Sequence, residues 1–279
     1  MTLSEGWQLY VADKTIEGLS PNTLGDYKTQ MNMLIRYFGD KDINGITVFD
    51  LKRYLAEKGS HLMLSSLGQR IRVMRTLFRY FSDEGFCEKN PAARLKEPKL
   101  PDQIPKAFSE EETVMLEEAC KNPKEHALTE FFFSTGCRIS EVQALNKSDI
   151  NWENRSCVVM GKGSKQREVY FSIKAKIWLK WYIDSRKDAD LALFVTDRAP
   201  HRMSKDTMRR NIKIVGKQSN LGRNMYPHMW RHTFATHMLN AGAPIEGVQE
   251  QLGHTSIKVT RRYCRLSGVR RKQIHDTYF

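Results

Sequence analysis

Apolar residues recur at helical spacing through the first 97 residues of the chain. Ser20-Pro21-Asn22-Thr23 indicates a helix start, because proline is favoured in the first turn of a helix. The apolar face of this helix continues towards Gly39 and consists of Tyr27, Met31, Leu34, Ile35 and Phe38. A shorter segment covers Val48–Leu55, and a further helix begins near Leu64 with the apolar face Leu67, Ile71, Met74, Leu77, Phe78 and Phe81. The pattern predicts an all-helical N-terminal domain.

A proline-rich stretch separates this region from the rest of the chain. Pro98, Pro101 and Pro105 lie within eight residues, and each proline disfavours a helical conformation in the residue before it. We therefore predict an extended linker over residues 98–105. The linker separates an N-terminal domain, residues 1–97, from a second domain, residues 106–279.

The second domain combines helical patterns with two short β-rich segments. Ser109-Glu110-Glu111-Glu112 has the capping-box pattern of a helix start, and a later helix through His126–Thr135 stops at Gly136. Ser156–Met160 and Glu168–Phe171 are rich in β-branched or aromatic residues and predict a small hairpin. The remainder is mostly helical. We expect a mainly α protein whose second domain is mixed α/β with a small β-sheet.

Composition excludes several classes of protein. The 279 residues are 40% hydrophobic and 28% charged, which is typical of a globular chain and not of a disordered or collagen-like one. No run of 18 apolar residues predicts a membrane span, and the N-terminus lacks the basic and apolar regions of a secretory signal. Five scattered cysteines without a CxxC pair argue against a disulfide framework or a zinc site, so we expect a cytoplasmic protein.

Positive charge is concentrated near the C-terminus. The chain has 45 Lys+Arg and 32 Asp+Glu, a net charge of +13. Residues 201–279 contain 15 basic and 4 acidic side chains, a balance of +11, whereas residues 1–100 and 101–200 give +3 and −1. Such a surface favours a polyanionic partner, because neutralising phosphates releases counterions. The alternative is a basic surface without a specific partner.

Four short motifs contain candidate catalytic residues. In Thr135-Gly136-Cys137-Arg138-Ile139-Ser140-Glu141, Arg138 lies at a predicted helix start, where a guanidinium can bind two phosphate oxygens. An ion pair between Arg138 and Glu141 is the structural alternative. In Gly161-Lys162-Gly163-Ser164-Lys165-Gln166-Arg167, Lys162 occupies the hairpin turn. A solvent-exposed lysine is the alternative there, and Lys165 and Arg167 stay open as the operative cation.

Histidines and a late tyrosine form the other two motifs. His228 and Arg231 lie three residues apart on one predicted helix, which suits proton transfer beside a cation. His228 and His232 also have the spacing of a zinc helix, but no acidic third ligand is apparent. We interpret His232 and His237 as packing or surface residues.

The last motif is Leu252-Gly253-His254, with Tyr263 nine residues later. His254 is either a phosphate ligand or a capping residue, since Gly253 permits a helix end. A phenol with a pKa near 10 is a weak nucleophile, so attack by Tyr263 needs neighbouring cations and a base. Candidate cations are Arg261, Arg262 and Arg265, and Tyr278 is the other C-terminal tyrosine candidate.

Taken together, these motifs resemble the tyrosine recombinase (phage integrase) family, including the Xer-type recombinases. The resemblance extends over nearly the whole chain. Ser20-Pro21-Asn22-Thr23, Asn90-Pro91-Ala92 and the proline linker resemble the core-binding, SAM-like domain of that family, and residues 106–279 resemble its catalytic domain.

The resemblance implies a reaction and roles for six residues. Tyr263 would attack a scissile phosphodiester, forming a 3′-phosphotyrosyl link and freeing a 5′ hydroxyl. Arg138 and Arg231 would hold the phosphate, His228 and His254 would assist, and Lys162 would protonate the leaving oxygen. No cofactor, metal or ATP is expected.

The resemblance also implies partners. We expect double-stranded DNA with short inverted-repeat core sites, a homotetramer on two duplexes that passes through a Holliday junction, and possible accessory proteins. Three alternatives stay open at this stage: a type IB topoisomerase-like enzyme that nicks and reseals one duplex, a non-catalytic DNA-binding relative of the fold, and a metal-dependent nuclease.

Overall fold

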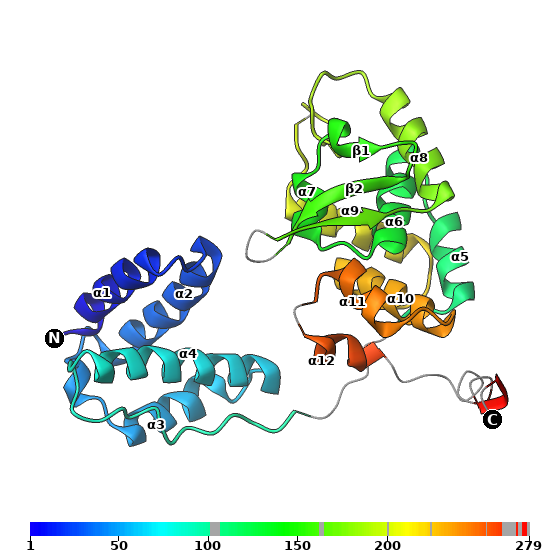
Figure 1. Ribbon diagram of the computed structural model, residues 1–279. Coiled ribbons are helices and arrows are strands. Elements are labelled where there is room, and N and C mark those ends of the chain that lie inside the picture. Colours follow the sequence, from blue (N-terminus) through cyan, green and yellow to red (C-terminus); the bar gives the residue numbers. More distant parts are fainter. Residues whose placement is uncertain are drawn as a thin grey trace. The chain divides into compact units, whose positions relative to one another are not determined.

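The structure is a computed structural model of the chain. It describes residues 1–100, 107–161, 165–199, 201–223, 225–254, 256–263, 272 and 275–277. The chain divides into two compact units, Met1–Asp102 and Gln103–Phe279 (Figure 1). The predicted linker, residues 98–105, lies partly outside the described residues. Within the described part, no helix is long and apolar enough to cross a membrane.

The N-terminal unit is all-helical, as the apolar spacing predicts. Its described residues form the helices α1 (Leu3–Ile16), α2 (Pro21–Phe38), α3 (Val48–Gly59) and α4 (Leu64–Asp83), with a 3-10 turn η1 (Ile43–Gly45) before α3. The Ser20 hydroxyl accepts a hydrogen bond from the backbone N–H of Thr23, and Pro21 opens α2. The core of this unit includes Met31, Leu34, Leu51, Met74, Leu77, Phe78 and Phe81.

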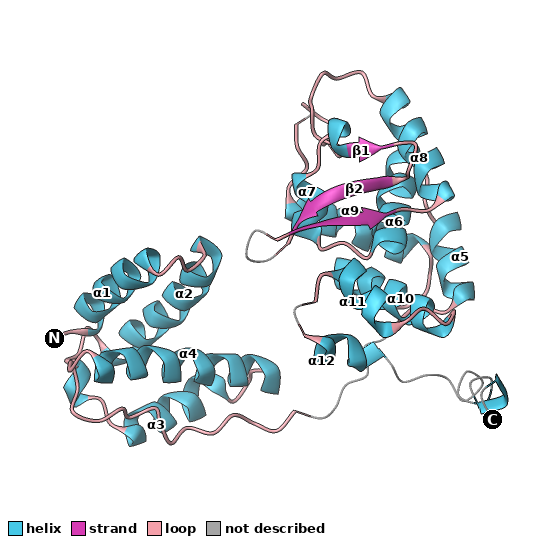
Figure 2. Ribbon diagram, viewed as in Figure 1, coloured by secondary structure: helices cyan, strands magenta, loops and turns pink. Residues whose placement is uncertain are grey.

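The described part of the C-terminal unit combines helices with a small sheet (Figure 2). Its helices are α5 (Glu110–Glu118), α6 (Pro123–Thr135), α7 (Ile139–Ala144), α8 (Ile173–Ser185), α9 (Lys205–Gln218), α10 (Pro227–Asn240), α11 (Ile245–Leu252) and α12 (Ile257–Thr260), with 3-10 turns η2 (Lys147–Asp149) and η4 (Arg261–Tyr263). The mainly α class with a small sheet is confirmed.

The sheet is antiparallel and has the strand order β1-β2-β3, formed by Ile150–Asn151, Ser156–Met160 and Gln166–Tyr170. Ser156 pairs with Tyr170 and Met160 with Gln166, so β2 and β3 make the predicted hairpin. Cys157, Val159 and Val169 are buried on one face, whereas Val158 and Met160 are exposed on the other. The tip of the hairpin, residues 162–164, lies outside the described residues.

Two apolar clusters position the candidate site. The larger one surrounds α6 and includes Phe131, Phe132, Phe194 and Trp230. The smaller one joins α10 and α11 through Phe234, Leu239, Val248 and Leu252, with Tyr263 packed against it. As Figure 1 shows, α10, α11 and α12 follow one another in one part of the C-terminal unit. Residues from three motifs are thereby brought together.

Candidate active site

Arg138 is presented by the turn between α6 and α7. Helix α6 ends at Gly136, whose φ of 60° is left-handed, and Arg138 is then the N-cap of α7. Its backbone N–H donates to Oε2 of Glu141 at 2.7 Å, and its Nη1 donates to Oε1 at 2.8 Å. The ion pair with Glu141, which the sequence left open as the structural alternative for Arg138, is therefore present. The side chain of Arg138 still keeps 28% of its exposure, so it remains accessible to an anion.

Arg231 is the second arginine and is almost entirely buried in α10. Nη1 donates to the carbonyl oxygen of Gly136 at 2.7 Å, and Nη2 donates to that of Leu252 at 2.5 Å. Burial, followed by the charge of Arg138, lowers the pKa of Arg231 to about 10. The guanidinium stays charged at neutral pH, and the two carbonyl oxygens orient it without a charge of their own.

Arg167, on β3, shares the carboxylate of Glu141 with Arg138. Nη1 and Nη2 of Arg167 donate to Oε1 and Oε2 of Glu141, each at 2.8 Å. The Glu141 side chain is only 1% exposed. Burial alone would raise the pKa of Glu141, but the hydrogen bonds and charges of Arg167 and Arg138 hold it below its usual value. Both Nη groups of Arg167 are therefore occupied by Glu141. Lys162, the first candidate cation of this motif, lies outside the described residues.

The end of helix α11 is the meeting point of all three arginines. The carbonyl oxygens of Gln251, Leu252 and Gly253 accept hydrogen bonds from Arg167 Nε (2.8 Å), Arg231 Nη2 (2.5 Å) and Arg138 Nη2 (3.2 Å), respectively. The last carbonyl groups of a helix have no partner within the helix and lie at the negative end of its dipole. The C-terminus of α11 thus concentrates three cations immediately before His254.

Three histidines lie beside these cations. Burial, followed by the charge of Arg231, lowers the pKa of His228 and also brings that of His254 to about 4. His232 lies one turn after His228, and burial followed by His228 lowers its pKa to about 4. The ring centroids of His228 and His232 are 6.5 Å apart. His254 Nδ1 and Thr260 Oγ1 share a hydrogen bond of 2.8 Å, which holds the imidazole against α12.

Tyr263 lies within this group of histidines. Its hydroxyl and His232 Nδ1 form a hydrogen bond of 3.0 Å. Its ring centroid is 5.2 Å from that of His232 and 6.2 Å from that of His254. The structure therefore brings together five of the six residues that the sequence singles out: Arg138, His228, Arg231, His254 and Tyr263. The sixth, Lys162, and the alternative candidates Arg265 and Tyr278 lie outside the described residues.

The contact that His232 makes with Tyr263 is not predicted by the sequence, which favours a packing or surface position for His232. The spacing of His228 and His232 is that of a zinc helix, and the same spacing places both rings on one face of α10. Among the described residues, no group of three or more His, Cys, Asp and Glu side chains could hold a metal ion. His237 does behave as a packing residue, since its Nε2 bonds to the carbonyl of Phe108 at 3.0 Å.

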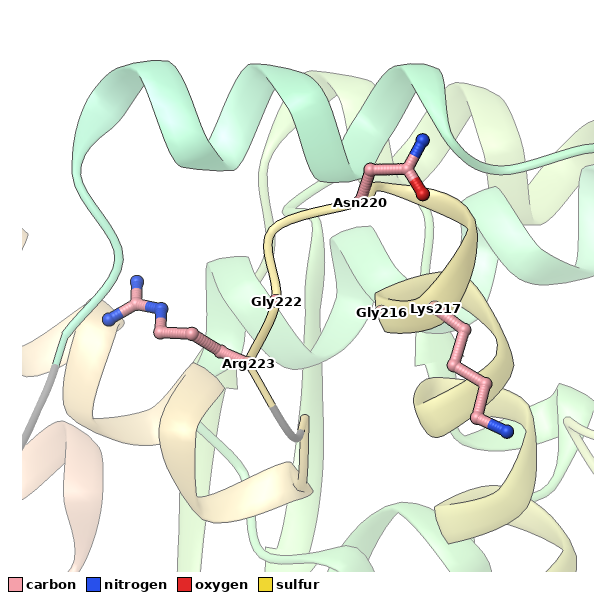
Figure 3. A pocket seen from close by; sticks show the side chains of 5 residues that line it. All are labelled: Gly216, Lys217, Asn220, Gly222 and Arg223. Carbon is pink, nitrogen blue, oxygen red and sulfur yellow. The ribbon is translucent and has the colours of Figure 1, made fainter.

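A hollow lined by two basic side chains lies elsewhere on the described part of the C-terminal unit. It is formed at the end of α9 by Gly216, Lys217, Asn220, Gly222 and Arg223 (Figure 3). The guanidinium of Arg223 pairs with the carboxylate of Glu112 and lies 5.0 Å from the ring centroid of Phe108. These contacts fasten α5 and the residue Phe108 before it to the loop that follows α9, and they give the hollow a structural explanation.

Comparison with family models finds a match for each unit. Residues 101–268 match the phage integrase family, and residues 8–85 match the phage integrase N-terminal SAM-like domain. The chain is similar to the tyrosine recombinase XerC of Pelobacter propionicus, with 30% identity over 275 residues that cover 94% of this chain and 91% of the relative. The XerC of Pseudomonas fluorescens is 29% identical over 273 residues, covering 93% of this chain and 90% of the relative.

Solved structures share the fold. The Tn1549 transposon integrase in complex with a circular intermediate DNA has a TM-score of 0.79 and 20% identity, with 99% of both chains covered. The XerH site-specific recombinase bound to a palindromic difH substrate has a TM-score of 0.75 and 19% identity, covering 98% of this chain and 84% of that one. The arrangement of helices and small sheet described above is therefore shared with proteins that are only 20% and 19% identical to this chain.

Proposed function

The chain belongs to the phage integrase family and is a tyrosine site-specific recombinase, and we propose that its catalytic residues are Arg138, Lys162, His228, Arg231, His254 and Tyr263. One observation carries this proposal. Two cationic guanidinium groups bind the consecutive carbonyl oxygens of Leu252 and Gly253, and the next residue, His254, packs against the ring of Tyr263. A phosphate bound by the arginines would thus lie close to a phenol hydroxyl.

In the proposed reaction the phenol oxygen of Tyr263 attacks the scissile phosphorus. The bond between Oη and phosphorus forms while the bond from phosphorus to the 5′ oxygen breaks, leaving a 3′-phosphotyrosyl ester. Arg138 and Arg231 stabilise the charge that grows on the phosphoryl oxygens, and their fixed orientation means that little reorganisation is needed during the step. His228 and His254 assist by hydrogen bonding, and Lys162 gives its proton to the 5′ oxygen.

Rejoining reverses the same chemistry. A 5′ hydroxyl from the partner duplex attacks the phosphotyrosyl ester, and Tyr263 leaves. Because the ester conserves the energy of the phosphodiester bond, the exchange needs neither ATP nor a metal ion. We propose that four copies act on two duplexes through a Holliday junction, at short inverted-repeat core sites and with accessory proteins where the DNA requires them. The XerH complex with a palindromic substrate supports the inverted-repeat part of the proposal.

The proposed compartment is the reducing cytoplasm. Cys87, Cys120, Cys137 and Cys157 are free and buried in the described part of the chain, which fits a protein folded without disulfides. Burial raises the pKa of the Cys137 thiol to about 11, so this residue, although adjacent to Arg138, stays protonated and unreactive at neutral pH.

A trapping assay tests the nucleophile. Nicked duplexes carrying the repeats that flank this gene in its source DNA are incubated with wild-type protein and with Y263F, and the products are separated in SDS. We expect an SDS-resistant protein–DNA adduct from the wild type alone, because only Tyr263 supplies the attacking oxygen.

Other outcomes would contradict the proposal in distinct ways. An adduct that persists in Y263F would move the nucleophile elsewhere, with Tyr278 as the next candidate. Tight DNA binding without an adduct from either protein would support the non-catalytic DNA-binding alternative. Relaxation of supercoiled DNA without recombinant products would support the type IB topoisomerase-like alternative.

A further inference from the structure

The hydroxyl oxygen of Tyr263, the proposed attacking atom, contacts a residue outside the proposed catalytic set. His232 Nδ1 lies 3.0 Å from Tyr263 Oη, which is hydrogen-bonding distance, and the two rings meet at 44°. His232 directly follows the buried Arg231 on helix α10, and His228 lies four residues earlier on the same helix. The imidazole is thus fixed on a rigid element and aimed at the phenol hydroxyl.

The electrostatic surroundings keep His232 neutral. The groups that face it are His228 and Arg231 from α10, His254 from the end of α11, and Tyr263 from η4. Burial, then His228 and Arg231, oppose a positive charge on the ring, so its pKa falls to about 4. A neutral imidazole has one ring nitrogen with a free lone pair, and in the tautomer that carries its proton on Nε2 this nitrogen is Nδ1, which then accepts from the phenol hydroxyl.

We propose that His232 is a further catalytic residue, which accepts the proton of Tyr263 during attack on the phosphate. This inference rests on the proposed function, in which Tyr263 is the nucleophile. The proton passes from Oη to Nδ1 as the bond from Oη to phosphorus forms. The bond to the 5′ oxygen breaks, and that oxygen takes its proton from Lys162. In rejoining, Lys162 takes the proton of the attacking 5′ hydroxyl, and His232 returns its proton to Oη as the phosphotyrosyl ester breaks.

This assignment separates two roles within α10. His228 lies one turn before His232 and remains available to the phosphate beside Arg231. An acceptor is needed at the nucleophile because the phenol must lose its proton on becoming an ester. The acidity of that proton rises steeply as the ester bond forms, so even a weakly basic imidazole can take it in a concerted step.

The test compares two substitutions of His232 in the full chain. H232N places an amide near the position of Nδ1, so it can hold the phenol by a hydrogen bond but cannot take a proton. H232F keeps a ring and removes both nitrogens. With nicked duplex at saturating concentration, we expect both variants to form the adduct about 100-fold or more slowly than wild type. DNA affinity should change less than about twofold, because neither change removes a cation.

A modified substrate shows whether the variants are defective at the nucleophile or at the leaving group. A duplex with sulfur in place of the scissile 5′ oxygen has a leaving group that needs no proton, so it restores variants that are defective in protonating the leaving group. We expect H232N and H232F to remain slow on this substrate, because their defect concerns the nucleophile. Restoration to the wild-type rate would overturn the proposal.

Matched controls separate this inference from the proposed function. H237N removes another histidine of α10, one that bonds to the Phe108 carbonyl, and should cleave at the wild-type rate once folded. A wild-type rate in H232N would show that a hydrogen bond suffices, and a wild-type rate in H232F would show that the contact is packing; either result overturns proton transfer. If H232F fails to fold, H232N decides. An adduct from Y263F would instead contradict the proposed function.

Discussion

The orientation of Arg138 and Arg167 depends on the buried carboxylate of Glu141. Glu141 binds Arg138 through Nη1 and Arg167 through two parallel hydrogen bonds, each at 2.8 Å. Bidentate arginine–carboxylate pairs fix geometry as well as charge. Glu141 therefore holds one proposed catalytic arginine in place and fastens strand β3, which leads back to Lys162, to the start of α7.

Replacing Glu141 by glutamine should weaken both the fold and the reaction. E141Q leaves two guanidinium groups without their counter-charge, and breaking such a buried pair costs about 3 kcal/mol or more. We expect the free energy of unfolding in urea to fall by that order and the rate of adduct formation to fall with it. E118Q removes a carboxylate from an exposed position on α5 and should change neither quantity.

The difference between E141Q and wild type should also depend on pH. The pKa of Glu141 is lower in the folded chain than in the unfolded one, so its stabilising contribution is fully present above about pH 5. That contribution is lost as the pH falls through the lowered pKa. A stability difference that stayed constant from pH 7 to pH 3 would contradict the charged state of Glu141.

Local motifs identify residues of the site but not their partners. Arg138, His228, Arg231, His254 and Tyr263 could be singled out because each stands in a short, recognisable stretch. The hydrogen bonds of Arg167 could not be predicted in this way, since their acceptors lie 26 residues before it and 84 residues after it. The contact between His232 and Tyr263, 31 residues apart, likewise exists only after α10 and η4 have packed together.

At the level of elements, the close approach of α6 to α10 and α11 rests on a glycine. A Cβ at Gly136 would lie 2.6 Å from Phe234 Cδ1 and 2.9 Å from Leu252 Cδ2, and the residue also has a φ of 60°. The carbonyl of the same residue accepts the hydrogen bond from Arg231. The end of α6 is thus both a packing surface and a ligand of a proposed catalytic arginine.

Gly136→Ala should therefore lower the free energy of unfolding more than the same change at another glycine with a similar left-handed φ. Gly222 has a φ of 63° with no atom within 4 Å of its Cβ position, and it lines the hollow of Figure 3. We expect Gly222→Ala to lower the free energy of unfolding by about 1 kcal/mol, from the left-handed backbone alone. Gly136→Ala should add roughly 1–3 kcal/mol from overpacking.

Thermal or urea unfolding measures the loss of stability in both variants. Adduct formation measures their cleavage rates. Only Gly136→Ala should slow the adduct, because only that change displaces an acceptor of Arg231. Equal losses of stability and equal cleavage rates in the two variants would contradict the packing argument.

Elements with a clear apolar face could be predicted, and those without one could not. Helices α2 and α4 follow from their spacing, and the β2–β3 hairpin from its β-rich flanks. Helix α1 was not recognised, because it buries only Leu3, Gly6 and Tyr10 while Leu9 and Ile16 remain exposed. Strand β1 has two residues, too few for any alternation, and it exists through its pairing with β2.

On the scale of the whole molecule, charge governs the encounter with DNA. The net charge of +13 resides mainly in residues 201–279, which include α9 and α10. Neutralising DNA phosphates with these side chains releases counterions, so affinity depends on the salt concentration whatever the base sequence.

Binding should therefore weaken steeply with salt. We expect log K to fall linearly with log[KCl], with a slope of about −0.9 for each phosphate neutralised. Fluorescence anisotropy between 50 and 200 mM KCl measures the slope, about −5 for roughly six phosphates. Sucrose at matched osmolality serves as the control for water activity. An affinity nearly independent of KCl would contradict the assignment of the C-terminal charge to DNA binding.

The three arginines at the end of α11 imply that the site tolerates a substitution at some positions but not an insertion or a deletion. Their acceptors at residues 251–253 are main-chain oxygens, which every amino acid provides. Exchanging the side chain of Gln251 leaves its acceptor in place. Inserting or deleting one residue within α11 rotates the helix end by about 100° and carries all three oxygens away from their arginines together. Composition can therefore vary at Gln251 while the length of α11 stays fixed, but Gly253 cannot be exchanged freely, since its φ is 61° and a Cβ there would lie 3.0 Å from Arg167 Cδ.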